Sequence, residues 1–162
     1  MLYGDVFREL ARRKVRYLVV GGFAVNLHGA ARLSYDLDLM IDLTPDNVAA
    51  ALDAMAALGF TPRQPVNAAD LLSPEKREAW MREKRAVVFS FAGDGFRSVD
   101  VFLKNPVDFE DAYRNKVEFP SGGAVIPVAG IKDIISMKRI AGRPRDLEDI
   151  AQLERIGRDR HE

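Results

Sequence analysis

The chain contains no cysteine, which excludes disulfide bonds, thiolate metal sites and cysteine nucleophiles. It contains only two histidines, so a histidine-rich metal site is excluded as well. Neither sign of charge is in excess: 24 basic residues balance 24 acidic ones. A formal net charge of zero gives no support for a general polyanion-binding protein, although it leaves room for a local basic patch.

Long hydrophobic runs are also absent. No apolar segment reaches the roughly 20 residues that span a membrane, and the first residues lack the apolar core of a signal peptide. We therefore predict no membrane association and a cytoplasmic location, which the lack of cysteine also fits. The chain has 162 residues, 48% of them hydrophobic and 30% charged, so we predict one globular domain over residues 1–162.

Apolar runs bounded by turn residues predict alternating strands and helices. We expect residues 62–73 to form a loop with one helical turn. The pattern predicts an α/β (α+β) fold, with a mixed sheet flanked by helices in residues 1–128 and a C-terminal helical pair in residues 129–162. The expected strands are 17–20, 36–42, 87–91, 97–103, 116–119 and 124–128, and the expected helices are 6–14, 23–28, 45–58, 75–85, 108–113, 131–141 and 145–156.

Two aspartates one residue apart are the most informative feature of the chain. Asp36 and Asp38 alternate with apolar residues on a predicted strand, so both side chains face the same side. Two like charges this close repel each other, and burying them is costly unless something neutralises them. A divalent cation such as Mg²⁺, which prefers oxygen ligands, would do so. The alternative is that the pair marks a strand edge or a helix cap.

A third carboxylate, Asp100, lies inside the apolar strand predicted at residues 97–103. Taken alone, it is an outward-facing residue on a half-exposed strand. If its strand neighbours the strand of Asp36 and Asp38, three carboxylates converge at one site. Three carboxylates can hold two Mg²⁺ ions, and that arrangement suits transfer of a nucleotidyl group.

A glycine pair, Gly21 and Gly22, follows the strand predicted at residues 17–20 and precedes a predicted helix. Glycines at such a junction let backbone N–H groups approach a phosphate closely. The alternative is a tight turn with no ligand. The pair belongs neither to a Walker loop nor to a dinucleotide fingerprint, because the further residues of both motifs are absent.

Residues 19–29 and 32–39 together resemble the nucleotidyltransferase superfamily of the polymerase-beta type, in which a glycine pair and a helix precede two carboxylates on a strand. The Arg-x-Ser-x-Asp-apolar-Asp form of residues 32–38 is most similar to the AbiEii-type small bacterial nucleotidyltransferases. Residues 135–139 and 143–150 match the lysine-bearing helix and the Arg-Asp-x-x-Asp helix of that branch, in order and spacing. Residues 62–84 match no motif of the family.

The resemblance implies that Asp36 and Asp38 are catalytic ligands of Mg²⁺ or Mn²⁺. Asp100 would be the third ligand or the base that activates the acceptor hydroxyl. The resemblance also implies a nucleotide-binding set formed by Gly21, Gly22, Arg32, Ser34, Lys138 and Asp146.

Several members of this set also have ordinary structural explanations. Lys138 would otherwise be a solvated helix residue, and Asp146 a helix N-terminal residue favoured by the dipole. Arg32 would only pair with Asp36, and Ser34 would only cap. Trp80, on a basic helix, stacks on a base or anchors that helix to the core.

The resemblance therefore implies a metal-dependent nucleotidyltransferase, which moves a nucleoside monophosphate from a triphosphate such as ATP to a hydroxyl acceptor. An RNA 3′ end would fit the toxin of a toxin–antitoxin pair; a protein side chain or a small molecule such as an antibiotic is also open. An antitoxin partner or a homodimer would complete a site on so short a chain. Two alternatives remain: an inactive binding module with the same fold, and a phosphohydrolase.

Overall fold

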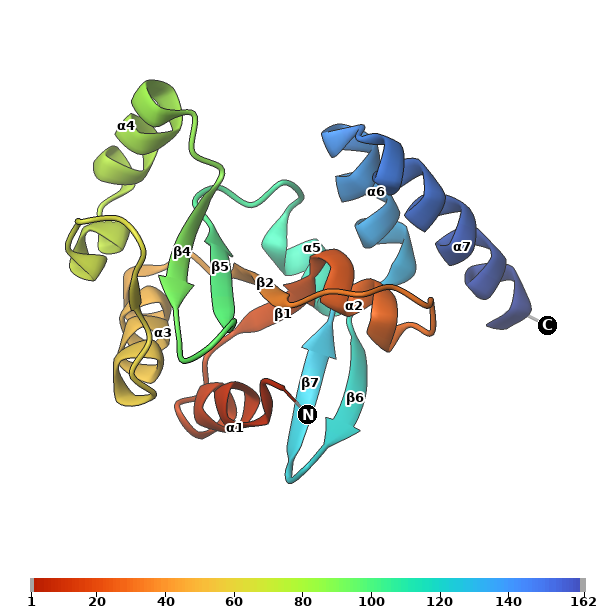
Figure 1. Cartoon of the computed structure of the whole chain (residues 1–162), viewed down its shortest axis with the longest axis horizontal. Helices are drawn as coiled ribbons and strands as arrows, with labels where there is room; N and C mark the ends of the chain where they lie inside the picture. The colour runs from red at the N-terminus through yellow and green to blue at the C-terminus, as the bar shows by residue number, and fades with distance from the viewer. Residues whose placement is uncertain (1, 161–162) are drawn as a thin grey trace.

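The computed structural model describes residues 2–160, and in that part seven strands form one mixed sheet (Figure 1). The strand order is β3-β4-β5-β2-β1-β7-β6. The β2–β5 and β1–β7 pairs are parallel, and the other four pairs are antiparallel. The strands are β1 (Tyr17–Val20), β2 (Asp36–Ile41), β3 (Thr61–Pro62), β4 (Val88–Ala92), β5 (Ser98–Phe102), β6 (Val117–Ser121) and β7 (Ala124–Val128).

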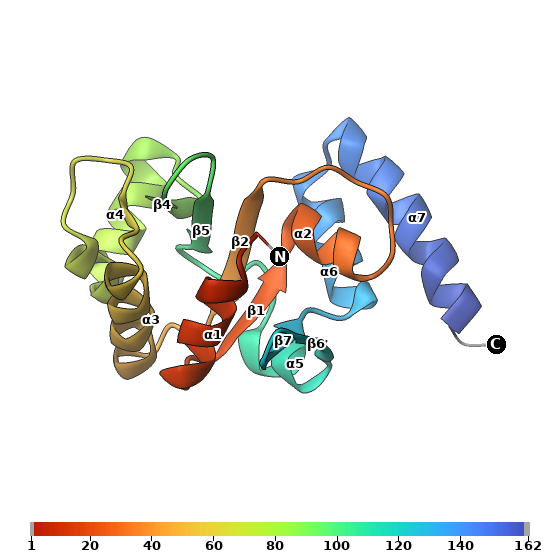
Figure 2. The same cartoon turned by 60° about the horizontal axis from the view of Figure 1, so that its bottom comes forward.

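Helices stand at both ends of this sheet. In both ribbon views α3 and α4 lie beyond β4, whereas the paired α6 and α7 lie at the opposite end (Figures 1 and 2). No helix among residues 2–160 is long and apolar enough to cross a membrane. The helices are α1 (Gly4–Arg12), α2 (Gly21–Leu27), α3 (Pro45–Ala57), the 3₁₀ helix η1 (Ala68–Leu72), α4 (Pro74–Lys84), α5 (Phe109–Arg114), α6 (Ile131–Ala141) and α7 (Pro144–Arg160).

The predicted fold class is confirmed, and the predicted bounds need small corrections. The helix expected at residues 131–141 has those bounds, whereas α7 is longer than residues 145–156 and α2 already begins at Gly21. The helical turn expected in the loop over residues 62–73 is η1, whereas the segment begins with the end of β3, which was not expected. β3 is too short to show a period of two in the sequence; its pairing with β4 defines it.

Successive side chains of β2 point to opposite faces of the sheet, one toward the core and the other toward the aspartates. Leu37, Leu39 and Ile41 are at most 2% exposed and point to the buried face. The register with β5 places Val99 and Val101 beside Leu37 and Leu39, so both strands contribute to the same core. The even-numbered residues of both strands consequently face the other side of the sheet.

The buried Tyr3 ties the beginnings of β2 and β5 together. Its hydroxyl donates a hydrogen bond to the carbonyl oxygen of Tyr35, just before β2, and accepts one of 3.0 Å from the backbone N–H of Ser98. The Tyr3 ring is fully buried and packs edge-on against Phe23 of α2, with ring centroids 5.8 Å apart. One side chain therefore links α2 to the two strands that carry the aspartates.

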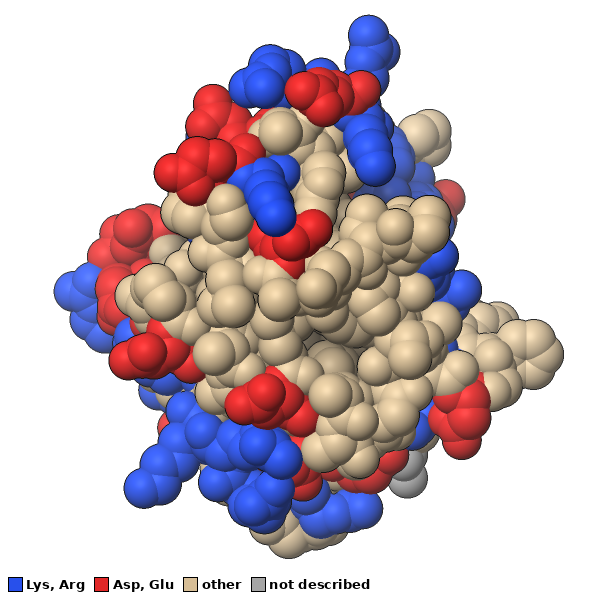
Figure 3. All heavy atoms as spheres, turned by 90° about the vertical axis from the view of Figure 1, so that its left-hand side faces the viewer, with Lys and Arg blue, Asp and Glu red and all other residues tan. Residues whose placement is uncertain are grey.

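Charged side chains of both signs are spread around the surface. On the side formed by α3 and α4, Lys, Arg, Asp and Glu gather along the upper and lower margins, and uncharged atoms cover the middle (Figure 3). This distribution agrees with the zero net charge. Basic character is therefore local, and the position of individual arginines and lysines relative to the aspartates matters more than the total.

Candidate active site

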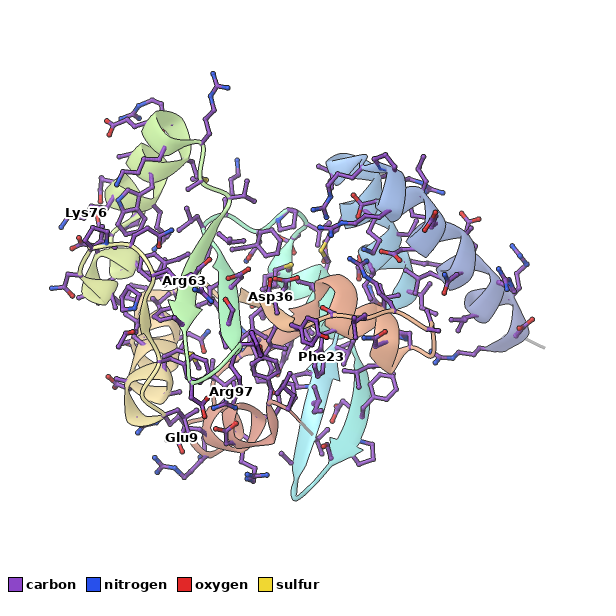
Figure 4. The ribbon with its side chains drawn as sticks, viewed as in Figure 1. Glu9, Phe23, Asp36, Arg63, Lys76 and Arg97 are labelled. Atoms are coloured by element: carbon purple, nitrogen blue, oxygen red, sulfur yellow. The ribbon has the colours of Figure 1, made fainter. Side chains whose placement is uncertain are left out.

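The three aspartates lie on one face of the sheet, on two neighbouring parallel strands. Asp38 of β2 stands directly beside Asp100 of β5 in the register, and Asp36 stands beside Ser98. Asp36 is exposed, whereas Asp38 and Asp100 are partly buried. Asp36 lies between the β4–β5 pair and α2 (Figure 4). We expect the three carboxylates to meet only if their two strands are neighbours, and β2 and β5 are neighbours.

Burial and mutual repulsion raise the pKa values of Asp38 and Asp100. Burial, together with the nearby charges of Asp100 and Asp36, raises the pKa of Asp38 to about 7, although Lys138 and Arg143 work in the opposite direction. Burial also raises the pKa of Asp100, and the charge of Asp36 adds to that effect. Two neighbouring carboxylates that resist ionisation together are typical of a site that holds a cation or moves a proton.

The donor set suits a hard cation, but the side chains do not form a closed cage. Within residues 2–160 no three Asp, Glu, His or Cys side chains are close enough together to form a ready metal site. The oxygen donors nevertheless come from adjacent strands and repel one another, and a divalent cation relieves that repulsion. The chemistry of Asp36, Asp38 and Asp100 therefore fits Mg²⁺ or Mn²⁺, which these three side chains would hold.

The glycine pair lies directly against the carboxylates. Gly21 has φ +68°, and a Cβ at this position would lie 2.0 Å from Oδ2 of Asp38. A Cβ on Gly22 would lie 2.9 Å from Oγ of Ser34 and 3.1 Å from Nε of Arg32. A side chain at Gly21 would be strained by the positive φ and would displace Asp38, so the backbone at the start of α2 approaches that carboxylate more closely than a side chain would allow; at Gly22 it would displace Ser34 and Arg32.

Lys138 is buried rather than solvated, which makes the solvated-helix interpretation wrong. Its exposed fraction is 6%, and its Nζ lies 2.8 Å from Oδ2 of Asp149 and 3.5 Å from Oδ1 of Asp146. Arg32 forms an ion pair with the same oxygen of Asp149. The expected alternative of an Arg32–Asp36 pair is therefore incorrect, because Asp149 holds Arg32 on the α7 side of the site.

Asp146 is fully buried and paired, so a favourable helix dipole is only part of its environment. Burial alone would raise its pKa, but hydrogen bonds from the side chain and backbone N–H of Arg143, together with the charge of Lys138, outweigh burial and lower the pKa to about 2. The Arg143 Nε to Asp146 Oδ2 distance is 2.8 Å. The negative charge of Asp146 therefore holds Arg143 and Lys138, the two cations that act on Asp38.

Arg63, Ser90, Arg143 and Asp149 belong to this region but were absent from the predicted site. The Nε of Arg63 lies 3.4 Å from Oγ of Ser98, and Arg63 and Ser90 both lower the pKa of Asp100. Figure 4 shows Arg63 on the β4–β5 side of Asp36. Nothing in the sequence singles out Arg63 or Ser90. Asp149 is the second aspartate of the Arg-Asp-x-x-Asp motif, and that motif could have identified it as a site residue.

His28 and Trp80 are structural in this arrangement. His28 is 1% exposed, with Nε2 2.8 Å from the carbonyl oxygen of Ala129 and Nδ1 3.0 Å from Arg160, so it joins the end of α2 to the end of α7. The Trp80 ring packs on Phe89 with centroids 5.4 Å apart. Ser34 lies beside Gly22, and its hydroxyl is 3.4 Å from the carbonyl oxygen of Asp36.

The family model described as "Nucleotidyl transferase AbiEii toxin, Type IV TA system" matches residues 7–162. The chain belongs to the AbiEii family. It is therefore a nucleotidyltransferase, as the glycine pair and the carboxylates on β2 predicted. A search of curated proteins finds no match.

Two solved structures share the fold of this AbiEii-family chain. The lincosamide antibiotic adenylyltransferase LnuA, lincomycin-bound, is 15% identical, with a TM-score of 0.60 and 96% of each chain covered. ANT(2'')-Ia in complex with adenylyl-2''-tobramycin is 14% identical, with a TM-score of 0.60, and the comparison covers 99% of this chain and 97% of that one. At these identities the likeness is one of fold alone.

Proposed function

We propose that this AbiEii-family chain moves a nucleoside monophosphate from a nucleoside triphosphate to a hydroxyl acceptor, with Asp36, Asp38 and Asp100 as its catalytic carboxylates. The single observation that carries the proposal is the register of β2 and β5, in which Asp38 stands beside Asp100. Asp36 lies on the same face, and the backbone of Gly21 approaches Asp38 closely.

In this proposal the triphosphate lies between the start of α2 and two cations, Lys138 of α6 and Arg143 just before α7. Gly21 and Gly22 leave room for phosphate oxygens beside backbone N–H groups. Lys138 and Arg143 already act on Asp38 as favourable charges, and the same charges stabilise phosphate oxygens. Arg32 and Ser34 line the other side of Gly22, whereas Asp146 keeps Arg143 and Lys138 in place.

Transfer is an in-line displacement at the α-phosphorus. The acceptor oxygen forms a bond to this phosphorus while the bond to the bridging oxygen of the β-phosphate breaks, and pyrophosphate leaves. Asp100, which stands beside Asp38, is the third ligand or the base that accepts the proton of the acceptor hydroxyl. Asp36, Asp38 and Asp100 would hold Mg²⁺ or Mn²⁺, which supplies charge neutralisation for the triphosphate and the leaving pyrophosphate.

The acceptor class follows less directly from the site. The family description names a toxin of a type IV toxin–antitoxin system, and an RNA 3′ end is the acceptor that fits such a role. A small molecule is the second candidate, because two proteins of the same fold are described with lincomycin and adenylyl-tobramycin. We keep both, with a protein side chain as the third, as outcomes of one experiment.

The experiment supplies each labelled nucleoside triphosphate in turn, with Mg²⁺ or Mn²⁺ and with total RNA, lincomycin or tobramycin as acceptor. The test variant is the double change Asp36→Asn and Asp38→Asn. Its matched control is Asp53→Asn, which removes an exposed carboxylate from α3. We expect label to move onto an acceptor with the wild type and the control, and not with the double variant.

Each outcome identifies a different property. Label on RNA, on the antibiotic or on the protein itself identifies the acceptor class, and the effective triphosphate identifies the base. Absence of transfer to every acceptor, together with no metal-dependent thermal shift from any triphosphate, would refute the catalytic assignment and leave a binding module.

A further inference from the structure

The outer edge of β4 is only partly covered by another strand. β3 pairs with the last two residues of β4, and the backbone N–H of Arg63 then donates a hydrogen bond of 3.0 Å to the carbonyl oxygen of Ser90. Continued in this register, the chain after β3 would bring Pro65 opposite Val88, but proline has no N–H to donate. β4 therefore keeps an open edge at Val88.

The backbone groups of Val88 point toward this open edge. Backbone groups of successive residues in a strand alternate between its two neighbours. The carbonyl oxygen of Val87 accepts a hydrogen bond from Leu103, on the β5 side, whereas that of Ser90 accepts one from Arg63. Val88 shares the direction of Ser90, and among residues 2–160 no backbone hydrogen bond from outside the sheet reaches it. Such an edge is able to pair with an extended peptide.

A pocket of about 330 Å³ lies along the open edge. Its walls are mainly apolar and include Val66 after β3, Trp80 of α4, Phe89 and Leu103. Phe89 pairs with Val101 on the core face of the sheet, so the pocket lies away from the three carboxylates. Its volume is in the range of ligand pockets and accommodates one large apolar side chain.

Three cations line this pocket and the hollow beside it. The hollow has a volume of about 490 Å³ and shares Ala86 and Val87 with the pocket. Lys84 lines the pocket, and Arg85 and Lys104 line the hollow. Among residues 2–160 these three side chains form no hydrogen bond or ion pair, and no carboxylate lines either space. The surface is therefore complementary to an acidic partner.

The apolar walls favour a peptide over a single-stranded nucleic acid. Nucleic acids of this kind stack their bases on aromatic side chains, but the single indole here already packs on Phe89, with ring centroids 5.4 Å apart. Val87, which lines both spaces, is 62% exposed. An exposed β-branched side chain beside an open strand edge is typical of a surface that contacts protein.

We propose that the open edge of β4 binds an acidic segment of another protein. The segment pairs with Val88 in an extended conformation, inserts one large apolar side chain beside Trp80 and places carboxylates on the three cations. This interaction is separate from the proposed transfer reaction, because the pocket and the carboxylates lie on different faces of the sheet. It also gives the basic end of α4 a role that the family motifs do not cover.

The chain contains a single tryptophan, so its fluorescence reports on the pocket directly. The probe is a short acetylated and amidated peptide with glutamates on both sides of a central phenylalanine, titrated into the full chain in EDTA. The test variant is the double change Lys84→Glu and Lys104→Glu, at two exposed positions. The matched control is Arg82→Glu, an exposed position on α4 that lines neither space.

We expect the peptide to change the emission of Trp80 in the wild type and in Arg82→Glu, and to bind the double variant roughly tenfold more weakly. A peptide with lysines in place of the glutamates should reverse this order. Replacement of the central phenylalanine by alanine should weaken binding to every protein. Methylation of backbone nitrogens at alternate positions should weaken binding in one register and spare it in the other, because only alternate N–H groups of an added strand face β4.

Several results would overturn the proposal. These are the absence of binding by the acidic peptide, equal binding by the double variant, and tighter binding of a single-stranded RNA than of the peptide. Self-association of the free chain in ultracentrifugation, lost in the double variant, would assign the edge to a second copy instead. The variant with Asp36→Asn and Asp38→Asn should bind the peptide like the wild type, so failure of the transfer reaction and failure of this interaction are measured separately.

Discussion

Neutralising Asp38 tests the electrostatics of the three carboxylates most directly. The pKa of Asp38 is about 7 in the folded protein, against an ordinary value of 3.8. Between these pH values the folded protein holds a proton that the unfolded chain has lost, so the free energy of unfolding falls as the pH rises through this window. The difference between 7 and 3.8 corresponds to about 4 kcal/mol, which is an upper limit because Asp36 and Asp100 titrate together with Asp38.

The change Asp38→Asn keeps the shape of the side chain and removes its charge. In EDTA and above pH 7, we expect the variant to be more stable than the wild type by up to about 4 kcal/mol. Near pH 4, where the wild-type side chain is neutral when folded, the difference should be small. Urea unfolding at several pH values measures it. Asp53→Asn, an exposed carboxylate on α3, is the control and should show no such pH-dependent gain.

Divalent cations give the second half of this test. Mg²⁺ or Mn²⁺ should stabilise the wild type, because an ion that binds only the folded state adds to its stability. The same ion should stabilise Asp38→Asn much less. The difference in free energy of unfolding between the two proteins should therefore shrink or change sign. If Asp38→Asn is equal to or less stable than the wild type at pH 8 in EDTA, the carboxylates do not repel one another as the argument requires.

Three further predictions concern residues around the carboxylates. Gly21→Ala should abolish transfer and destabilise the fold, because its Cβ would meet Asp38; Gly59→Ala has a similar φ but open space, and should cost only about 1 kcal/mol of backbone strain with activity kept. Lys138→Met should lower the free energy of unfolding by about 3–5 kcal/mol, because it leaves Asp149 and Asp146 buried with fewer partners. Its control, the exposed Lys132→Met, should change that energy by less than about 0.5 kcal/mol in the same urea titrations. Burial lowers the pKa of His28 below 6.5, so the unfolded chain takes up a proton first and stability should fall as the pH drops below about 6.5. A His28→Gln variant that retained this acid sensitivity would assign it to other groups.

The sequence by itself determined the local features of the molecule. The alternation of Asp36 and Asp38 with Leu37 and Leu39 places both carboxylates on one face, because side-chain direction in a strand repeats every two residues. The helix expected at residues 23–28 after the glycine pair is α2, which already begins at Gly21, and the helix expected at residues 131–141 is α6 with those bounds. These properties depend on neighbours along the chain, so they can be read without the fold.

The tertiary structure alone decided which distant residues meet. Whether Asp100 stands beside Asp38 depends on the parallel pairing of β2 with β5, and no local pattern specifies a strand's neighbour. Arg63 lies near Asp100 only because the two-residue β3 pairs with β4. Arg32 and Asp149 are 117 positions apart, and the packing of α7 brings them together. Long-range pairing follows from burial of the whole apolar surface, so the sequence indicated the three carboxylates, Lys138 and Arg32 as candidates but not the Arg32–Asp149 and Lys138–Asp149 ion pairs.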